Sequence, residues 1–172
     1  MLNTKSYSTL KIINSPAHAT AHPTTHAREW LAGLIDGDGS FYVSFNKNGS
    51  IKTGFSITGD QDSRPLLEGI QAKFKGIGSI KEGSKNELVY TITGLNQIID
   101  ILIPFIDNNP LFSERASHYD KFKTVSLILK SEQPLTIESK LKIVELAYDM
   151  NKQGKRRSLS KTDYVNLLKK TS

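Results

Sequence analysis

The sequence predicts an α+β fold, in which helices pack against one antiparallel sheet of about four strands. Residues 41–45 and 51–58 alternate between apolar and polar side chains, as half-buried strands do, and Asn48-Gly49 between them favours a hairpin. A second predicted hairpin pairs residues 77–81 with 88–93. Because a segment with helical apolar spacing precedes each hairpin, the expected order is helix, hairpin, helix, hairpin and further helices.

The composition excludes several classes of protein. The 172 residues include no cysteine, which excludes a disulfide framework, a thiolate metal site and a cysteine nucleophile. No apolar run approaches the length needed to span a bilayer, so we expect no membrane association. The formal net charge of +6 favours a polyanionic partner, with nucleic acid as the first candidate, but it is equally compatible with simple solubility.

The domain organisation predicted is an N-terminal extension, residues 1–25, followed by a single domain, residues 26–172. The domain divides into a core of about 26–130 and a helical, basic tail, 131–172. The extension carries no acidic residue, and two interpretations stay open: an organelle transit peptide, or an arm that docks on a partner or on nucleic acid. His18, His22 and His26 lie four apart, but Pro23 interrupts their spacing, so we do not assign them a metal.

The first predicted helix begins near Thr25, an acceptable N-cap, and ends at Asp36-Gly37-Asp38-Gly39. In the strand that follows, Phe41, Val43 and Phe45 should face the core. The later helices are expected at 65–75, with Leu66, Leu67, Ile70 and Phe74 buried, at 95–103, closed by Pro104, at 114–130 and at 136–150, with Thr136 as N-cap. Ser160 to Asp163 resembles a capping box that opens a short final helix.

The end of the first helix has unusual chemistry. Ala32, Gly33 and Gly37 are small and would allow another helix to approach closely. Asp36 and Asp38 stand where a helix prefers cations, at a cost of roughly 0.3–1 kcal/mol for each exposed acid. A cation bound at this end would reverse that cost, and carboxylate and carbonyl oxygens suit Mg²⁺. The alternative interpretation is that Asp-Gly-Asp-Gly is only a polar turn.

Residues 31–39, LAGLIDGDG, resemble the signature of the LAGLIDADG homing endonuclease family, with Gly37 where the family name has alanine. Trp30, Ser40 and Phe41 also fit. The resemblance implies an αββαββα domain with one curved antiparallel four-stranded sheet, here with extra C-terminal helices. It implies an enzyme, a divalent-metal-dependent endonuclease that makes site-specific double-strand breaks in DNA. One motif copy supplies half an active centre, so the resemblance implies a homodimer.

The same resemblance implies roles for individual residues. Asp38 and the Gly37 carbonyl would hold the metal, Mg²⁺ or another divalent cation such as Mn²⁺, and Asp38 would be the essential acid. Gln61 and Arg115 are the catalytic helpers expected, although by direct count Gly59 takes the first helper's position and Asp60 is an alternative. The residues expected at the dimer interface are Leu31, Ala32, Gly33, Ile35 and Asp36.

The predicted DNA-binding residues are polar side chains on the outer face of the two hairpins or in their turns. They are Tyr42, Ser44, Asn46, Lys47, Lys52, Ser56, Thr58, Lys81 and Lys85. Family habit implies an intron-encoded protein of the mitochondrion or chloroplast. The competing interpretation is a non-catalytic relative that binds nucleic acid: an intron maturase or a component of an RNA–protein assembly, with intron RNA as partner.

Overall fold

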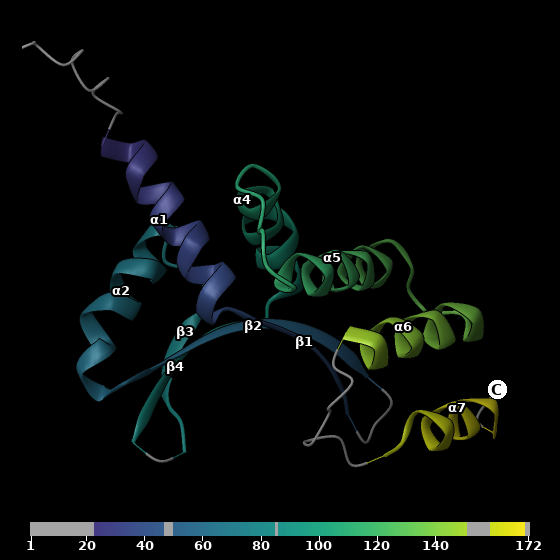
Figure 1. Ribbon diagram of the computed structural model, residues 1–172. Coiled ribbons are helices and arrows are strands. Elements are labelled where there is room, and N and C mark those ends of the chain that lie inside the picture. Colours follow the sequence, from purple (N-terminus) through teal and green to yellow (C-terminus); the bar gives the residue numbers. More distant parts are fainter. Residues whose placement is uncertain (1–22, 47–49, 85, 151–158, 171–172) are drawn as a thin grey trace, which may run out of the picture.

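A four-stranded antiparallel sheet with strand order β1-β2-β4-β3 organises the fold (Figure 1). The computed structural model describes residues 23–46, 50–84, 86–150 and 159–170. The elements are α1 (Pro23–Asp38), β1 (Ser40–Phe45), β2 (Ile51–Asp60), the 3₁₀ turn η1 (Gln61–Ser63), α2 (Arg64–Lys73), β3 (Ser79–Glu82), β4 (Glu87–Ile92), α3 (Leu95–Gln97), the π-helical turn η2 (Ile98–Leu102), α4 (Ile103–Asp107), α5 (Arg115–Ser131), α6 (Ile137–Met150) and α7 (Lys161–Lys170). The predicted fold class is therefore confirmed.

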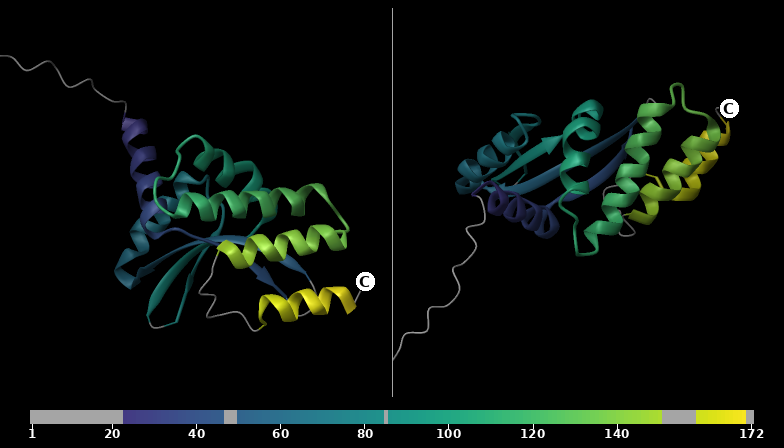
Figure 2. Two further views of the ribbon diagram at one scale, coloured as in Figure 1. Left: turned by 45° about the vertical axis from the view of Figure 1, so that its right-hand side comes forward. Right: turned by 90° about the horizontal axis from the view of Figure 1, so that it is seen from above.

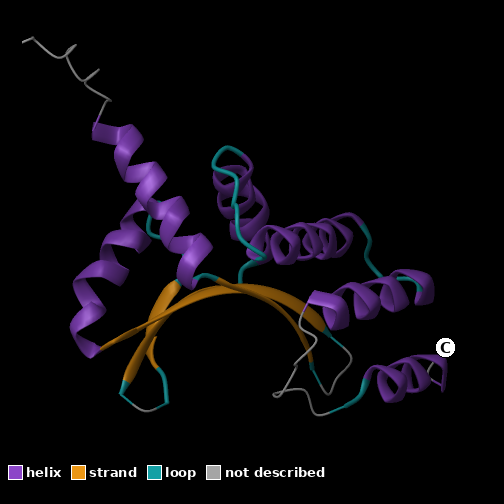
Figure 3. Ribbon diagram, in the orientation of Figure 1, coloured by secondary structure: helices purple, strands orange, loops and turns teal. Residues whose placement is uncertain are grey.

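The sheet is a single curved layer, and helices α1 to α6 lie on one side of it (Figures 1 and 3). The opposite face curves away from these helices. Alternation along the strands explains the division, because Phe41 and Val43 are buried while Tyr42 between them is partly exposed. In β2, Phe55 and Ile57 are buried on the same side of the sheet. One face of the sheet therefore builds the core, and the other faces outward.

The core joins this inner face to α5. Phe41 packs against Phe55 and Phe122 with ring centroids 5.2 and 5.1 Å apart. Two buried polar groups satisfy each other across the same contact, since the Ser126 hydroxyl donates to Thr53 Oγ1 at 3.1 Å. In α2, the predicted burial of Leu67, Ile70 and Phe74 is confirmed, whereas Leu66 is exposed.

Pro104 does not close the third predicted helix, so that expectation is wrong. The π-helical turn η2 leads directly into α4, and Pro104 lies in the first turn of α4. A proline is tolerated in a first turn, because the amide hydrogen that it lacks has no partner there. The helical path consequently continues to Asp107.

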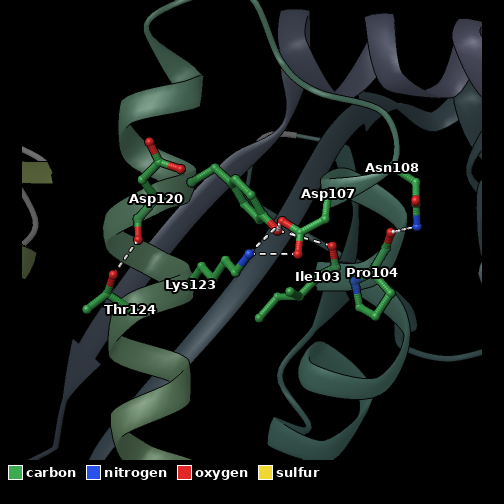
Figure 4. Close-up of polar contacts among 8 residues, drawn as sticks. Ile103, Pro104, Asp107, Asn108, Asp120, Lys123 and Thr124 are labelled. Carbon is green, nitrogen blue, oxygen red and sulfur yellow. Dashed lines mark hydrogen bonds and ion pairs between the residues drawn. The ribbon is translucent and has the colours of Figure 1, made fainter.

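A polar cluster fastens the end of α4 to α5 (Figure 4). Lys123 Nζ lies 2.6 and 2.8 Å from the two carboxylate oxygens of Asp107, and the Tyr119 hydroxyl donates to Oδ1 of Asp107 at 2.7 Å. Burial alone would raise the pKa of Asp107, but the hydrogen bonds from Lys123 and Tyr119 and the charge of Lys123 lower it overall. Asn108 and Asn109 side chains donate to the carbonyls of Pro104 and Phe105, both at 2.7 Å.

Helices α6 and α7 pack side by side at one end of the sheet (Figure 2). Both start as predicted. Thr136 Oγ1 accepts the Ser139 amide at 3.2 Å, and Ser160 and Asp163 form the reciprocal bonds of a capping box. Tyr164 of α7 packs against Phe45 at the end of β1, with centroids 4.6 Å apart.

Some predictions fall outside the described residues: the extension up to residue 22, the Asn48-Gly49 turn, Lys47, Lys85 and the basic run 151–158. Within the described ranges, no helix combines the length and the apolar character required to cross a membrane.

Candidate active site

Helix α1 passes into β1 through a single residue, Gly39. The Gly39 amide donates to the Ile35 carbonyl at 2.9 Å, which completes the last helical turn. A Cβ atom at position 39 would lie 2.5 Å from that carbonyl oxygen and 3.0 Å from the Phe55 ring, so only glycine fits. The junction places Asp36, Gly37 and Asp38 directly above the start of the sheet.

Asp36 fastens this helix end to the loop that precedes α5. Its carboxylate accepts the amides of Phe112 and Ser113, both at 3.1 Å, and the Ser113 hydroxyl at 2.6 Å. Partial burial would raise the pKa of Asp36, but these three donors and the charge of Arg115 lower it overall. Asp36 is therefore held as an anion, and its oxygens are engaged within its own chain.

Arg115, at the start of α5, caps the last carbonyls of α1. Its Nε donates to the Asp36 carbonyl at 2.7 Å, and its Nη2 donates to the Gly37 carbonyl. Its own amide donates to Ser113 Oγ at 3.1 Å, which closes the network. A guanidinium at the carboxyl end of a helix offsets the partial negative charge there. The sequence predicted Arg115 and Gly37 as site residues, and the structure brings the two together.

The environment of Asp38 differs from that of Asp36. Asp38 is exposed at the end of α1, and within the described parts of the chain it forms no hydrogen bond or ion pair. The same parts contain no group of three His, Cys, Asp or Glu side chains able to hold a metal ion. One copy of the chain thus offers a carboxylate and a neighbouring carbonyl, hard oxygen ligands that fit Mg²⁺ or Mn²⁺ as part of a coordination shell.

The predicted helpers at the end of β2 have mainly local contacts among the described residues. Asp60 accepts the amide and hydroxyl of Ser63 at 2.9 and 2.6 Å, which caps η1. A Cβ atom at Gly59 would lie 2.6 Å from Ser63 Cβ, so no side chain fits there without movement. Gln61 begins η1, and among the described residues no hydrogen bond links it to the end of α1. Its catalytic role stays a prediction.

The outer face of the sheet carries the side chains predicted to bind DNA. Strand register places Tyr42 opposite Gly54 and Ser44 opposite Lys52, with Lys81 farther across the sheet opposite Val89. A Cβ atom at Gly54 would lie 2.3 Å from the Tyr42 ring, so the end of this ring occupies the space over Gly54 on the neighbouring strand. Asn46 donates to Ser50 Oγ at 2.7 Å. The other predicted residues of the strands that the structure describes, Ser56 and Thr58, alternate onto the same face.

The dimer residues predicted from the sequence need correction. Leu31 and Ile35 are only 1% and 0% exposed, because they face the chain's own core, and they cannot contact a second copy. Gly33 and Gly37 lie on the open side of α1, where an added Cβ atom would meet no described atom beyond the helix itself within 4 Å. Ala32 is half-buried and Asp36 is engaged in the network above.

Two exposed aromatic residues near this open side were not predicted as site residues. Trp30 on α1 is 50% exposed, and Phe112, whose amide is bound by Asp36, is 90% exposed. The signal for Trp30 was available, since it stands three and seven positions before Gly33 and Gly37 on the helix. Phe112 lies in a loop without periodicity, so no pattern could identify it.

Comparison with known proteins agrees with this geometry. The profile of the family described as LAGLIDADG endonuclease matches residues 31–126. The chain is 33% identical over 149 residues to the probable intron-encoded endonuclease Cox1-I1b of Schizosaccharomyces pombe, covering 82% of this chain and 36% of that protein. It is 30% identical over 123 residues to the intron-encoded RNA maturase bI4 of Saccharomyces cerevisiae, covering 70% of this chain and 18% of that protein.

Among solved structures, I-SmaMI bound to uncleaved DNA target in the presence of calcium ions superposes with a TM-score of 0.69 and 34% identity. The match covers 73% of this chain and 45% of I-SmaMI. The chain therefore spans less than half the length of each of these relatives. With its motif, its fold and its helix-end acids in agreement, the chain belongs to the LAGLIDADG endonuclease family.

Proposed function

We propose that this chain is one half of a site-specific DNA endonuclease that requires a divalent metal ion and acts as a homodimer. Asp38 carries the proposal, because it is an exposed carboxylate at a helix end that has no cationic partner among the described residues. Intron-encoded endonucleases among the relatives support it. An intron origin follows from the same relatives, and location in the mitochondrion or chloroplast stays a prediction.

Bound at Asp38 and the Gly37 carbonyl, Mg²⁺ or Mn²⁺ would supply an activated water and charge stabilisation for hydrolysis of a phosphodiester. The residues of the chain have separate tasks. Asp38 holds the cation, the Asp36 network fixes the helix end, and the outer face of the sheet binds the duplex. A second copy, packed through the open side of α1 at Gly33 and Gly37, completes the centre.

Cleavage of a DNA library tests the proposal. The wild-type chain, Asp38→Asn and Asp107→Asn would each be incubated with Mg²⁺ and either randomised DNA or intron-insertion sequences. We expect discrete double-strand cuts from the wild type and from Asp107→Asn, and none from Asp38→Asn. Specific binding without cuts by any of the three proteins would contradict the proposed activity.

DNA recognition has its own test. Tyr42 crosses Gly54 on the outer face, and it forms no hydrogen bond with any described residue, so its hydroxyl is available to a base edge. Tyr42→Phe should relax base preference at one position of the target by about 5- to 150-fold, since a lost base contact costs roughly 1–3 kcal/mol. Ser126→Ala, in the core, serves as the control and should leave the preference unchanged.

A second function has one observation in its favour. The expected helper position is Gly59, which has no side chain, and Ser63 occupies the space beside it. In addition, a relative of this chain is named as an RNA maturase. A non-catalytic protein that binds intron RNA would need Asp38 neither for binding nor for splicing. Stable binding of structured intron RNA, unaffected by Asp38→Asn and without DNA cleavage, would establish this second function instead.

A further inference from the structure

Arg115 and a divalent cation would both bind the carbonyl oxygen of Gly37. The Gly37 carbonyl accepts a hydrogen bond from Arg115 Nη2, and the Asp36 carbonyl accepts one from Nε at 2.7 Å. The Gly37 carbonyl is also one of the two oxygen groups that the chain offers to a metal. The free chain thus already has a cation at the end of α1, and that cation comes from its own α5.

The two cations differ in what holds them. Arg115 is tethered by the chain close to the Ser113–Asp36 contact, which keeps its guanidinium near the carbonyls. A metal ion must come from solution and must also bear the repulsion of a positive charge a few ångströms away. The carboxylate of Asp38 attracts both cations, but no hydrogen bond or ion pair joins it to Arg115 among the described residues.

We propose that Arg115 and the divalent cation compete for the end of α1. Arg115 is a positioning residue in the free chain, where it caps the helix and lowers the affinity for metal. This inference rests on the proposed metal site at Asp38.

The first test measures Mn²⁺ binding to the DNA-free, full-length protein, by the electron paramagnetic resonance signal of free Mn²⁺. Arg115→Gln removes the charge, and we expect it to bind Mn²⁺ at least about fivefold more tightly than the wild type. Arg115→Lys keeps the charge and should stay within about twofold of the wild type. Asp38→Asn should abolish the binding in either background. Equal or weaker affinity in folded Arg115→Gln would overturn the proposal.

A second measurement needs no variant of Arg115. In the wild-type protein, an Arg115 Nη2–H is hydrogen-bonded to the Gly37 carbonyl, the oxygen for which the metal would compete, so its hydrogen should exchange slowly with solvent. Saturating Mg²⁺ should speed this exchange, as followed by NMR of ¹⁵N-labelled arginine, and should have no effect in Asp38→Asn. Unchanged exchange at saturating Mg²⁺ would overturn the competition even if Arg115→Gln did not fold.

The two proposals fail in different ways. Cleavage that depends on Asp38, together with Mn²⁺ affinity unaffected by Arg115→Gln, would leave the proposed function in place and remove only the competition. Absence of cleavage, and of metal binding with or without DNA, would remove the proposed function itself.

Discussion

Two helices of this chain end on aspartate residues beside α5, and the surroundings of these acids differ. At the end of α4, Lys123 binds the carboxylate of Asp107 directly, and asparagine side chains cap the carbonyls. At the end of α1, the cation Arg115 binds carbonyls, while amide and hydroxyl donors satisfy Asp36. Asp38 is left without a cationic partner among the described residues.

The difference predicts which acid is structural and which is functional. An acid that is neutralised within its own chain, such as Asp107, contributes to the stability of the fold. An unneutralised carboxylate at a helix end costs free energy unless a ligand compensates for it. We therefore expect the same residue type at the same kind of position to have two roles, which the placement of the nearest cation distinguishes.

The largest expected effect is on the rate of DNA cleavage when each of the two acids, Asp38 and Asp107, is replaced. Asp38→Asn should lower the rate of DNA cleavage more than about 100-fold, because loss of a metal ligand exceeds the effect of changing its supporting groups. Asp107→Asn should change the rate of the folded protein less than about twofold, in the same assay. Similar losses of cleavage rate in both variants would mean that the position of the nearest cation does not distinguish a functional acid from a structural one.

Asp36→Ala should lower the free energy of unfolding by about 2 kcal/mol, because the substitution removes a charged acceptor with three donors. Urea unfolding at one fixed protein concentration measures the change. Asp62→Ala is the matched control, since Asp62 is exposed and forms no hydrogen bond or ion pair with the described residues, and its effect should stay within about 0.5 kcal/mol.

Lys123→Met should cost less, about 1 kcal/mol, because both members of its ion pair with Asp107 are a third or more exposed. The same urea titration gives this value. Mn²⁺ affinity should not change in Lys123→Met, and a change would connect the α4 cluster to the helix end of α1.

The smallest effect concerns pH. The pKa values of Asp36 and Asp107 are both lowered from an ordinary value of 3.8 in the folded chain. Their contribution to stability is therefore complete above that value and declines as the pH falls through the lowered folded values. Below about pH 4, the melting temperature of the wild type should therefore fall more steeply with decreasing pH than that of the Asp36→Asn, Asp107→Asn double variant. Parallel curves of melting temperature against pH would show that neither acid contributes to the pH dependence of stability.

Local patterns in the sequence predicted most of the fold. Alternation in 41–45 and 51–58 gives the two faces of the sheet, because side chains of a strand point to opposite sides regardless of the rest of the chain. Caps such as Thr136 and Ser160 are also local, and both are confirmed. Pro104 was misjudged because its effect depends on whether it lies inside a helix or in a first turn.

The site was predictable only in part, since its contacts join distant segments. Arg115 and Gly37 lie 78 positions apart, and no periodicity reveals that one donates to the other. The assignment of Leu31 and Ile35 to a dimer interface overlooked the fact that a helix has two sides. Their apolar spacing with Leu34 indicates the chain's own core, whereas Gly33 and Gly37 mark the opposite side.

The single-residue junction at Gly39 has a mechanical consequence. No flexible segment separates Asp38 from β1, and the Ile35 carbonyl and the Phe55 ring enclose the glycine. We therefore expect Asp38 and β1 to move together. If the chain cleaves DNA as proposed, a duplex that seats incorrectly on the sheet would displace the Asp38 carboxylate, so discrimination between target sequences would extend from binding to the chemical step.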